Sequence, residues 1–378
     1  MKRLADICDI QYGYAFDSKC FTEDSSYPQL VRIRDVKRGY SETYYSGNYP
    51  DEYILSEGDL LIGMDGEFNI ARWKCSGALL NQRVCKLTTK VGTNEEYLRF
   101  AMLKSLKEIE QRTAFVTVKH LSAKELNKLE LDVPELTKQD KIADTLSRLE
   151  RVIEARKEKL EELDELIKAR FVEMFGDMLL NSKNWPEVRL DEIADIVSGI
   201  TKGRKIKEQE LFEVPYMAVS NVKDGYIDWT TVKTVMASQA EIDKYQLKPF
   251  DVLMTEGGDP DKVGRGAIIH EPPKNCIHQN HIFRVRLNRG TLLPEYMEQY
   301  LQQQKAKRYF LGCAKQTTGI ASINMRQLTG LPVVVPEMQL QKEYVSFVHQ
   351  VDKSKVKVQK ALDETQKLFD SLMQQYFG

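Results

Sequence analysis

Basic and amide side chains are concentrated in a few short, glycine-containing stretches of this 378-residue sequence. Arg and Lys bind phosphate oxygens and guanine edges, whereas Asn and Gln suit adenine edges. Candidates for such contacts in the first part of the chain are Tyr12, Tyr14, Lys19, Arg32, Arg34, Lys37, Arg38, Gln82 and Arg83. Those further along are Lys202, Arg204, Lys205, Lys207, Asn221, Lys262, Arg265, Asn280, His281, Lys315, Gln316 and Thr317. Each of them, taken singly, is equally typical of an ordinary protein surface.

Motifs for catalysis are absent from the sequence. It contains no GxxxxGK[ST] phosphate loop, no HExxH and no GxSxG. The stretch 199–205, GITKGRK, comes nearest to an anion cradle but lacks the required spacing. His270, Cys276, His278 and His281 fit no zinc spacing and are more typical of polar residues at strand ends. We therefore predict no catalytic residue and no metal site on this chain.

Acidic side chains in one loop leave an alternative open. Glu256, Asp259 and Asp261 could in principle hold Mg²⁺, as carboxylates do in a nuclease. The first half of the chain offers Asp65 and Glu67 at the matching place, but without a following lysine in nuclease spacing. The other interpretations are a solvated acidic loop or carboxylates that accept hydrogen bonds from cytosine amino groups.

A long helix is predicted over residues 138–176. A seam repeats in alternating steps of four and three residues, which is the heptad pattern of a coiled coil. The seam consists of Ile142, Leu146, Leu149, Ile153, Arg156, Leu160, Leu163, Ile167, Arg170 and Met174. Gly176 is a typical stop residue. Such a stripe needs a partner helix to cover it.

The partner is predicted within the same chain, because residues 340–378 repeat the pattern 202 positions later. The second seam is Tyr344, Val348, Val351, Lys355, Val358, Leu362, Thr365, Phe369, Leu372 and Tyr376. A Val-Pro-Glu precedes each helix and an aromatic-Gly ends each one. The polar seam residues are either compensated by residues of the other helix or mark sites where other proteins dock. The alternative to pairing within one chain is a coiled coil formed between two chains.

The segments before the two helices also match each other. Residues 3–10 align with 189–196, 31–40 with 217–226, and 53–62 with 245–254. Strands are expected in the last two pairs, and helices at Glu96 and Glu295. The frame repeats, while the loops differ in length and charge. We predict two similar globular domains at 1–137 and 181–337, and two long helices at 138–180 and 338–378.

Composition favours a cytoplasmic chain with two packed domains. Six cysteines form no CxxC, which is typical of reduced thiols. No apolar run is long enough to cross a membrane, and no signal peptide is expected. The net charge of −1 excludes a uniformly basic coat but allows local basic patches.

The duplicated order of these features resembles the specificity (S) subunit of type I restriction–modification systems. The likeness rests on the Leu4–Ile7 and Leu190–Ile193 openings, the Val-Pro-Glu segments with Gln139 or Gln341, and the Phe-Gly ends. It covers the whole chain and implies an α+β fold with two similar target-recognition domains separated by two antiparallel coiled-coil helices.

The resemblance also implies a function. Each domain would read one half of a bipartite, asymmetric double-stranded DNA target, and the chain would have no catalytic site or cofactor of its own. Two modification subunits, which bind S-adenosylmethionine and methylate adenine, and two restriction subunits, which use ATP and Mg²⁺, would assemble around it. The alternatives are a coiled-coil adaptor that ignores DNA and a nuclease or methyltransferase with a fused helix.

Overall fold

The structure is a computed structural model that describes residues 1–378 except 113–119, 205–209, 260–261 and 318. The chain forms two compact units. Residues 1–158 and 358–378 make the first unit, and residues 159–357 make the second. Each long helix therefore contributes to both units. Within the described residues, no helix is sufficiently long and apolar to cross a membrane.

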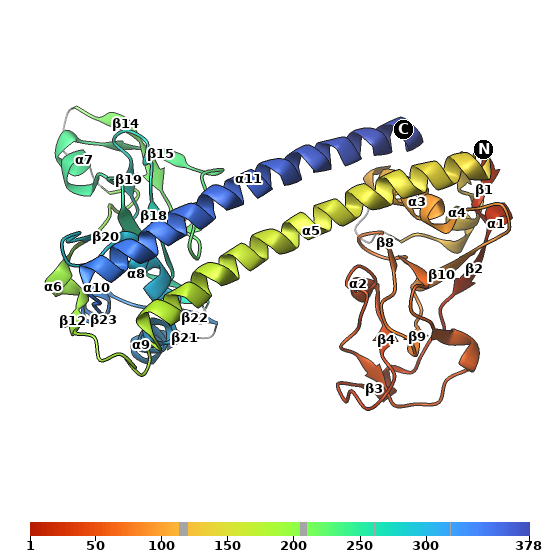
Figure 1. The fold of residues 1–378 in the computed structure, drawn as a ribbon, viewed down its shortest axis with the longest axis horizontal. Helices are drawn as coiled ribbons and strands as arrows, with labels where there is room; N and C mark the ends of the chain where they lie inside the picture. The colour runs from red at the N-terminus through yellow and green to blue at the C-terminus, as the bar shows by residue number, and fades with distance from the viewer. Residues whose placement is uncertain (113–119, 205–209, 260–261, 318) are drawn as a thin grey trace. The chain divides into compact units, whose positions relative to one another are not determined.

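The first unit is built on a four-stranded antiparallel sheet in the order β2–β10–β7–β8 (Figure 1). These strands are β2 (Cys8–Tyr12), β10 (Val84–Thr89), β7 (Leu60–Gly63) and β8 (Ile70–Arg72). Smaller pairings join β1 (Lys2–Arg3) to β11 (Glu130–Leu131), β3 (Phe21–Thr22) to β5 (Tyr44–Tyr45), and β9 (Ala78–Leu80) to β4 (Leu30–Val31) and β6 (Ile54–Leu55). The helices are α1 (Leu4–Ile7), α2 (Ile33–Val36), α3 (Glu95–Arg112) and α4 (Ala123–Lys128).

The second unit repeats this sheet in the order β13–β20–β16–β18. The strands are β13 (Ala194–Ser198), β20 (Ile282–Leu287), β16 (Asp251–Thr255) and β18 (Gly266–Ile269). Three further sheets join β12 (Glu187–Arg189) to β23 (Pro332–Val334), β14 (Phe212–Met217) to β15 (Lys233–Ala237) and β19 (Ile277–His278), and β22 (Ile320–Ser322) to β17 (Gly257–Gly258) and β21 (Lys315–Thr317). Its helices are α6 (Leu190–Ile193), α7 (Gln239–Tyr245), α8 (Pro294–Leu301), α9 (Gln304–Cys313) and α10 (Met325–Thr329). The predicted internal repeat is confirmed by this shared strand order.

The long helices are α5 (Leu136–Phe175) and α11 (Met338–Phe377), each of 40 residues. All the seam residues predicted from the heptads are buried or half-buried, because the two helices pack antiparallel on each other and on the units' cores. Arg156, Thr365 and Lys355 are compensated across the pair, whereas Arg170 bonds to Glu173 of its own helix at 2.8 Å. The Arg156 guanidinium donates to the Ala361 carbonyl and the Thr365 hydroxyl in the first unit. In the second unit, Lys355 donates to the Asp164 carboxylate at 2.5 Å.

A buried glutamine fixes the start of each long helix. The Gln139 amide donates to the Pro134 and Gly92 carbonyls at 2.8 and 3.1 Å, and its oxygen accepts from the Asn94 N–H at 2.8 Å. Gln341 makes the same three bonds in the second unit, to Pro336, Thr291 and Leu293. Both side chains are fully buried, so each bond is made in the absence of competing water. The glutamine is thus a structural part of the repeated frame.

The strands predicted over 31–36 and 217–222 are wrong beyond their first residue. The chain leaves β4 at Val31 and β14 at Met217 and turns into short helical segments. The cause is a carboxylate or amide three residues after the turn begins, which accepts a hydrogen bond from the backbone. Asp35 accepts from the Arg32 N–H at 3.0 Å, and Asn221 accepts from the Ala218 N–H at 2.9 Å. Arg32 and Arg34 therefore lie on a helical turn.

Candidate nucleic-acid interface

Three segments of the first unit meet beyond the end of β7. The loop after β7 carries Asp65, the turn before β10 carries Arg83, and the residue before Leu121 is His120. Backbone bonds fix them: the Met64 N–H donates to the Arg83 carbonyl at 2.8 Å, and the Leu121 N–H donates to the Met64 carbonyl at 2.7 Å. Residues far apart in sequence are therefore held at one place, which we call the first loop cluster.

The side chains of the first loop cluster pair with one another. The Arg83 Nε lies 3.6 Å from Asp65 Oδ2, and its Nη1 lies 3.1 Å from the Nδ1 of His120, whose ring also contacts Asp65. Arg83 adopts a φ of +69°, in the left-handed region that non-glycine residues rarely occupy. Half of its side chain remains exposed at 52%. The cluster thus presents a held but accessible guanidinium.

The predicted basic residues around α2 adjoin this cluster. Lys37 lies 3.8 Å from Glu67, which is in the loop after β7. Arg32, Arg34, Lys37 and Arg38 are all exposed, as are Lys19 and Gln82. Because surface ion pairs at this distance are weak, these cations can exchange a carboxylate for a phosphate at little cost.

The second unit has an equivalent arrangement beyond β16, which we call the second loop cluster. The Glu256 N–H donates to the His281 carbonyl at 3.0 Å, and the Ile323 N–H donates to the Glu256 carbonyl at 2.8 Å, which repeats the backbone bonding of the first unit. The Glu256 Oε2 lies 2.5 Å from His281 Nδ1, and the Asn280 Nδ2 lies 3.3 Å from the other ring nitrogen. Lys315 is brought alongside because its strand β21 pairs with β22, which in turn pairs with β17.

A glycine directly after β2, and another directly after β13, lets the end of that strand approach the loop cluster of its unit. A Cβ on Gly13 would lie 2.0 Å from the Asn81 carbonyl oxygen, and one on Gly199 would lie 1.9 Å from the His278 carbonyl oxygen. No side chain fits at such distances. The glycine that follows each predicted opening segment therefore allows the strand end and the turn before β10 or β20 to touch.

Several predicted residues have structural contacts. The Tyr12 hydroxyl accepts from Asn127 at 2.9 Å, and the Tyr14 ring packs on Phe16 and Tyr53 with centroids 5.1 and 5.2 Å apart. Asn221 is fully buried and caps the turn described above. Asn221 thus shapes the surface from beneath it.

The basic stretch after Gly199 is only partly described. Lys202 is exposed, whereas Arg204 forms a bidentate ion pair with Glu241 of α7, with both distances 2.5 Å. This pairing, with the Ser238 cap, lowers the pKa of the Glu241 carboxyl. Lys262 is exposed and pairs with Asp259, while Arg265 is half-buried. Lys205 and Lys207 lie outside the described residues, as do the side chains of Gln316 and Thr317.

The clusters offer hydrogen-bond donors and acceptors on exposed or half-buried side chains. Among the residues that the structure describes, no group of three His, Cys, Asp or Glu side chains could hold a metal ion. His278 is buried, and this burial lowers its pKa to about 4 while its Nδ1 lies 3.0 Å from the Ile282 carbonyl. Arginine, histidine, asparagine and carboxylate side chains at an accessible loop surface are the types that read base edges.

Sequence reasoning missed His120, although it considered Asp65 and Glu256. His120 has Ser322 at the equivalent place, since Asp65 pairs with His120 as Gly257 pairs with Ser322. A histidine without a counterpart in the other half gives no repeat signal. The offset of 202 aligns His120 with Ser322, but only tertiary contacts bring the two residues beside the loops after β7 and β16.

The sequence profile of the family described as "Type I restriction modification DNA specificity domain" matches residues 1–165 and 182–365. The chain belongs to this family. It is 27% identical to the EcoBI specificity subunit of Escherichia coli, with 99% of this chain and 84% of the relative covered. It is 26% identical to the putative MjaX specificity subunit of Methanocaldococcus jannaschii over 52% of this chain and 46% of the relative.

Solved structures of the family share the fold. The S subunit of a type I system from M. genitalium superposes with a TM-score of 0.58 at 16% identity, covering 100% of this chain and 95% of that one. A chain from a structure titled as the basis of complex assembly and conformational transition of the type I R-M system gives 0.55 at 18% identity, covering 100% and 96%. The chain therefore has the α+β architecture expected for a type I specificity subunit.

Proposed function

We propose that each unit of this specificity subunit reads one half of a bipartite, asymmetric DNA target through its loop cluster. The observation that carries this proposal is that one backbone frame presents different side chains at the same place. Arg83 with Asp65 and His120 occupies the position that His281 with Glu256 and Asn280 occupies in the second unit. Two such different sets of donors and acceptors select different base edges.

The basic residues near each cluster serve phosphates. Phosphate contacts orient a protein on DNA, and base contacts supply the sequence preference. Arg32, Arg34, Lys37 and Arg38 are placed for this role in the first unit, and Lys202, Lys262 and Lys315 in the second. Tyr12 and Asn221 shape the surface through their own hydrogen bonds.

The long helices set the unread gap between the half-sites and provide the surface on which modification subunits dock. Each has 40 residues, or about 60 Å at 1.5 Å per residue. Successive major-groove sites on one face of B-DNA are about 34–36 Å apart, which helices of this length can span. S-adenosylmethionine, ATP and Mg²⁺ act on the two modification and two restriction subunits of the complex rather than on this chain.

The experiment that tests the proposal is a methylation map. The chain is expressed with the modification subunit encoded beside it in a methylation-free host, and the DNA is sequenced for methyladenine. We expect a split motif with two short defined halves and a fixed gap. An assembled complex that methylates nothing, or methylates without a motif, would favour the adaptor alternative.

Substitutions then assign each half. Arg83→Ala should relax one half of the motif and leave the other intact, and His281→Ala should do the reverse. Arg148→Ala removes an arginine exposed on α5 and bonded to Asp144, so it serves as the control that leaves both halves unchanged. If Arg83→Ala and His281→Ala relaxed the same half, assignment of one cluster to each half-site would be refuted.

A further inference from the structure

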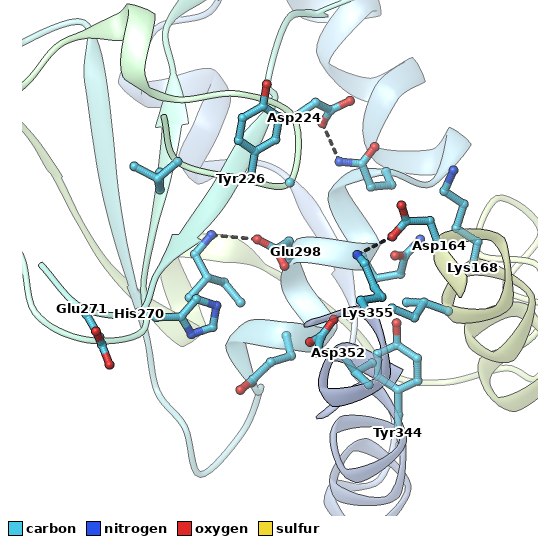
Figure 2. Close-up of a pocket in the computed structure, with 18 of the residues that line it drawn as sticks. Asp164, Lys168, Asp224, Tyr226, His270, Glu271, Glu298, Tyr344, Asp352 and Lys355 are labelled. Atoms are coloured by element: carbon cyan, nitrogen blue, oxygen red, sulfur yellow. Dashed lines mark hydrogen bonds and ion pairs between the residues drawn. The ribbon is translucent and has the colours of Figure 1, made fainter. Parts of the chain in front are cut away.

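The second unit contains a cavity of about 970 Å³ between the ends of the long helices, α8, β18 and the loop after Val222 (Figure 2). Six carboxylates line it against two lysines, which makes it strongly acidic. The acids are Asp164, Asp224, Glu271, Glu295, Glu298 and Asp352, and the other charged or titratable side chains of the wall are Lys168, Lys355, His270, Tyr226 and Tyr344.

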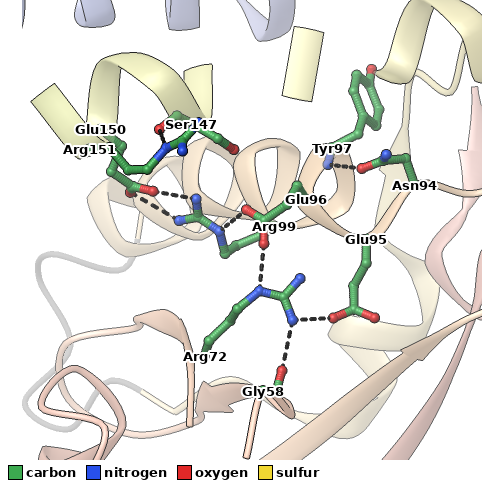
Figure 3. Close-up of polar contacts among 10 residues, drawn as sticks. All are labelled: Gly58, Arg72, Asn94, Glu95, Glu96, Tyr97, Arg99, Ser147, Glu150 and Arg151. Atoms are coloured by element: carbon green, nitrogen blue, oxygen red, sulfur yellow. Dashed lines mark hydrogen bonds and ion pairs between the residues drawn. The ribbon is translucent and has the colours of Figure 1, made fainter. Parts of the chain in front are cut away.

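Arginines fill the corresponding place in the first unit (Figure 3). Arg99 lies between two carboxylates: its Nε donates to Glu96 at 2.7 Å, and its Nη atoms donate to Glu150 at 3.1 and 2.5 Å. Arg72 extends the network, donating to Glu96 at 2.5 Å and to Glu95 at 2.6 Å. Each carboxylate there has a guanidinium partner within the chain.

The repeat places these residues on equivalent positions. Tyr97 and Tyr296 both donate to a backbone carbonyl at the start of the link to the long helix, those of Asp132 and Val334, so Glu96 and Arg99 correspond to Glu295 and Glu298. The matching glutamine bonds at the starts of α5 and α11 make Glu150 correspond to Asp352. The sheet register makes Arg72 correspond to Ile268, which pair with Leu60 and Val252 respectively. Two acids are therefore kept, while the arginines become Glu298 and Ile268.

The lost cations are not replaced within the described part of the second unit. Lys355 is paired with Asp164, and Lys168 is 2.8 Å from Glu165. Glu298 accepts a hydrogen bond from the Ile268 N–H at 2.8 Å and has no ion pair among the described residues, and neither has Asp352. His349 approaches Glu295 at 3.6 Å. Packing of carboxylates against one another is unfavourable unless a cation joins them.

We propose that this cavity binds a basic segment of the modification subunit, with an arginine or lysine side chain between Glu295, Glu298 and Asp352, where Arg99 lies in the first unit. This inference rests on the proposed function, because the occupant is the subunit assigned to dock on the long helices. The same carboxylate positions hold a guanidinium in the first unit, which is the direct precedent for the ligand chemistry.

A protein segment fits the cavity better than DNA. Six carboxylates repel phosphates. Tyr226 and Trp229 stand at the wall with 60% and 42% of their surface exposed, and aromatic faces stack on guanidinium groups and recur at protein interfaces. The cavity is also walled by α5 and α11 together, so an occupant contacts both helices at once.

The test compares three variants for assembly with the modification subunit, measured as the dissociation constant of the purified proteins. Glu298→Arg supplies the cation from within the chain and should weaken assembly by at least about tenfold, because it occupies the site and repels the incoming cation. Glu298→Gln with Asp352→Asn replaces two carboxyl groups by amides of the same shape and should weaken assembly and its salt dependence. Asp243→Arg reverses an exposed charge on α7 as the matched control and should change nothing.

The outcomes separate this inference from the proposed function. Glu298→Arg should keep or raise the melting temperature, since it reproduces the arrangement of Glu96, Arg99 and Glu150. If a folded Glu298→Arg chain assembles as well as the wild type, the cavity proposal is overturned. If Glu298→Arg does not fold, unchanged assembly of the double variant has the same meaning. Either result leaves the proposed function intact when the wild-type complex methylates a split motif. A wild-type chain that does not bind the modification subunit would overturn both.

Discussion

Replacing Glu298 by Gln should stabilise the free chain, and the gain should depend on pH. Burial raises the pKa of this carboxyl to about 7, the carboxylates of Glu295, Asp352 and Asp224 add to the rise, and the hydrogen bond from the Ile268 N–H opposes it. The folded state therefore holds a proton that the unfolded chain releases near the ordinary value of 4.5. Gln keeps the shape and can still accept the Ile268 bond, but carries no charge.

The size of the effect follows from linkage. Each pKa unit corresponds to about 1.4 kcal/mol, so a rise from 4.5 to about 7 amounts to at most about 3.5 kcal/mol. Because the carboxyl retains some contact with solvent, we expect about 1–2 kcal/mol. Below pH 4.5 the group is protonated in both states and costs nothing; the penalty grows as the pH rises and is complete above about 7. Wild type and variant should therefore be equal near pH 4 and differ at pH 8.

Scanning calorimetry at several pH values measures this directly. For a unit of residues 159–357, about 1–2 kcal/mol corresponds to roughly 2–8 °C in melting temperature. Glu343→Gln removes an exposed carboxylate of α11 and is the control. Destabilisation by this buried carboxyl would be refuted if Glu298→Gln and wild type had equal melting temperatures at pH 8. It would also be refuted if the melting temperature of Glu298→Gln exceeded that of the wild type by as much at pH 5 as at pH 8.

Three further predictions concern the frame and the DNA surface. Gln341→Ala removes three buried hydrogen bonds and should lower the free energy of unfolding by about 2–4 kcal/mol, as measured by urea titration; a loss below about 1 kcal/mol would contradict its role. Arg156→Ala removes the two hydrogen bonds that join α5 to Thr365 and Ala361 of α11, and should lower the melting temperature more than Arg148→Ala, which affects an exposed pair. Lys202→Glu should weaken DNA binding of the complex and lower the slope of log K against log salt by about 1–2, and an unchanged slope would count against a phosphate contact.

The helices and the repeat were predictable because their signals are periodic. A 3.5-residue spacing of apolar residues indicates which side chains of a helix face a partner helix. The buried or half-buried seam from Ile142 to Met174 therefore follows from the order of residue types alone. The partner followed from the second copy of the pattern. Whether Arg156 and Lys355 were compensated or exposed depended on the stagger of the two helices, which the heptads leave open.

The loop clusters were less predictable because they depend on tertiary contacts. Arg83 was identified by residue type, but the pairing of its side chain with His120 joins residues 37 positions apart. Asn221 and Asn280 were both predicted from residue type, since amides suit adenine edges. Burial separates them: Asn221 caps a turn beneath the surface, while Asn280 is half-buried beside His281. Arg204 similarly forms an ion pair with Glu241 in the folded chain, and nothing in the sequence indicates this pairing.

The two units differ in sequence at the position where a bound partner could supply the cation that the chain itself supplies in the first unit. Gln139 and Gln341 make the same three bonds because each links the carbonyl before its long helix to a backbone N–H and a carbonyl in the turn before α3 or α8. The position of Arg99 and Glu298 lacks that constraint, since a cation can come from the chain or from another protein. Replacing an arginine by a glutamate between two carboxylates that both units keep destabilises a free chain. The same replacement is tolerable in a complex whose partner supplies the cation. The residues that break the repeat are therefore the better guide to what this subunit binds.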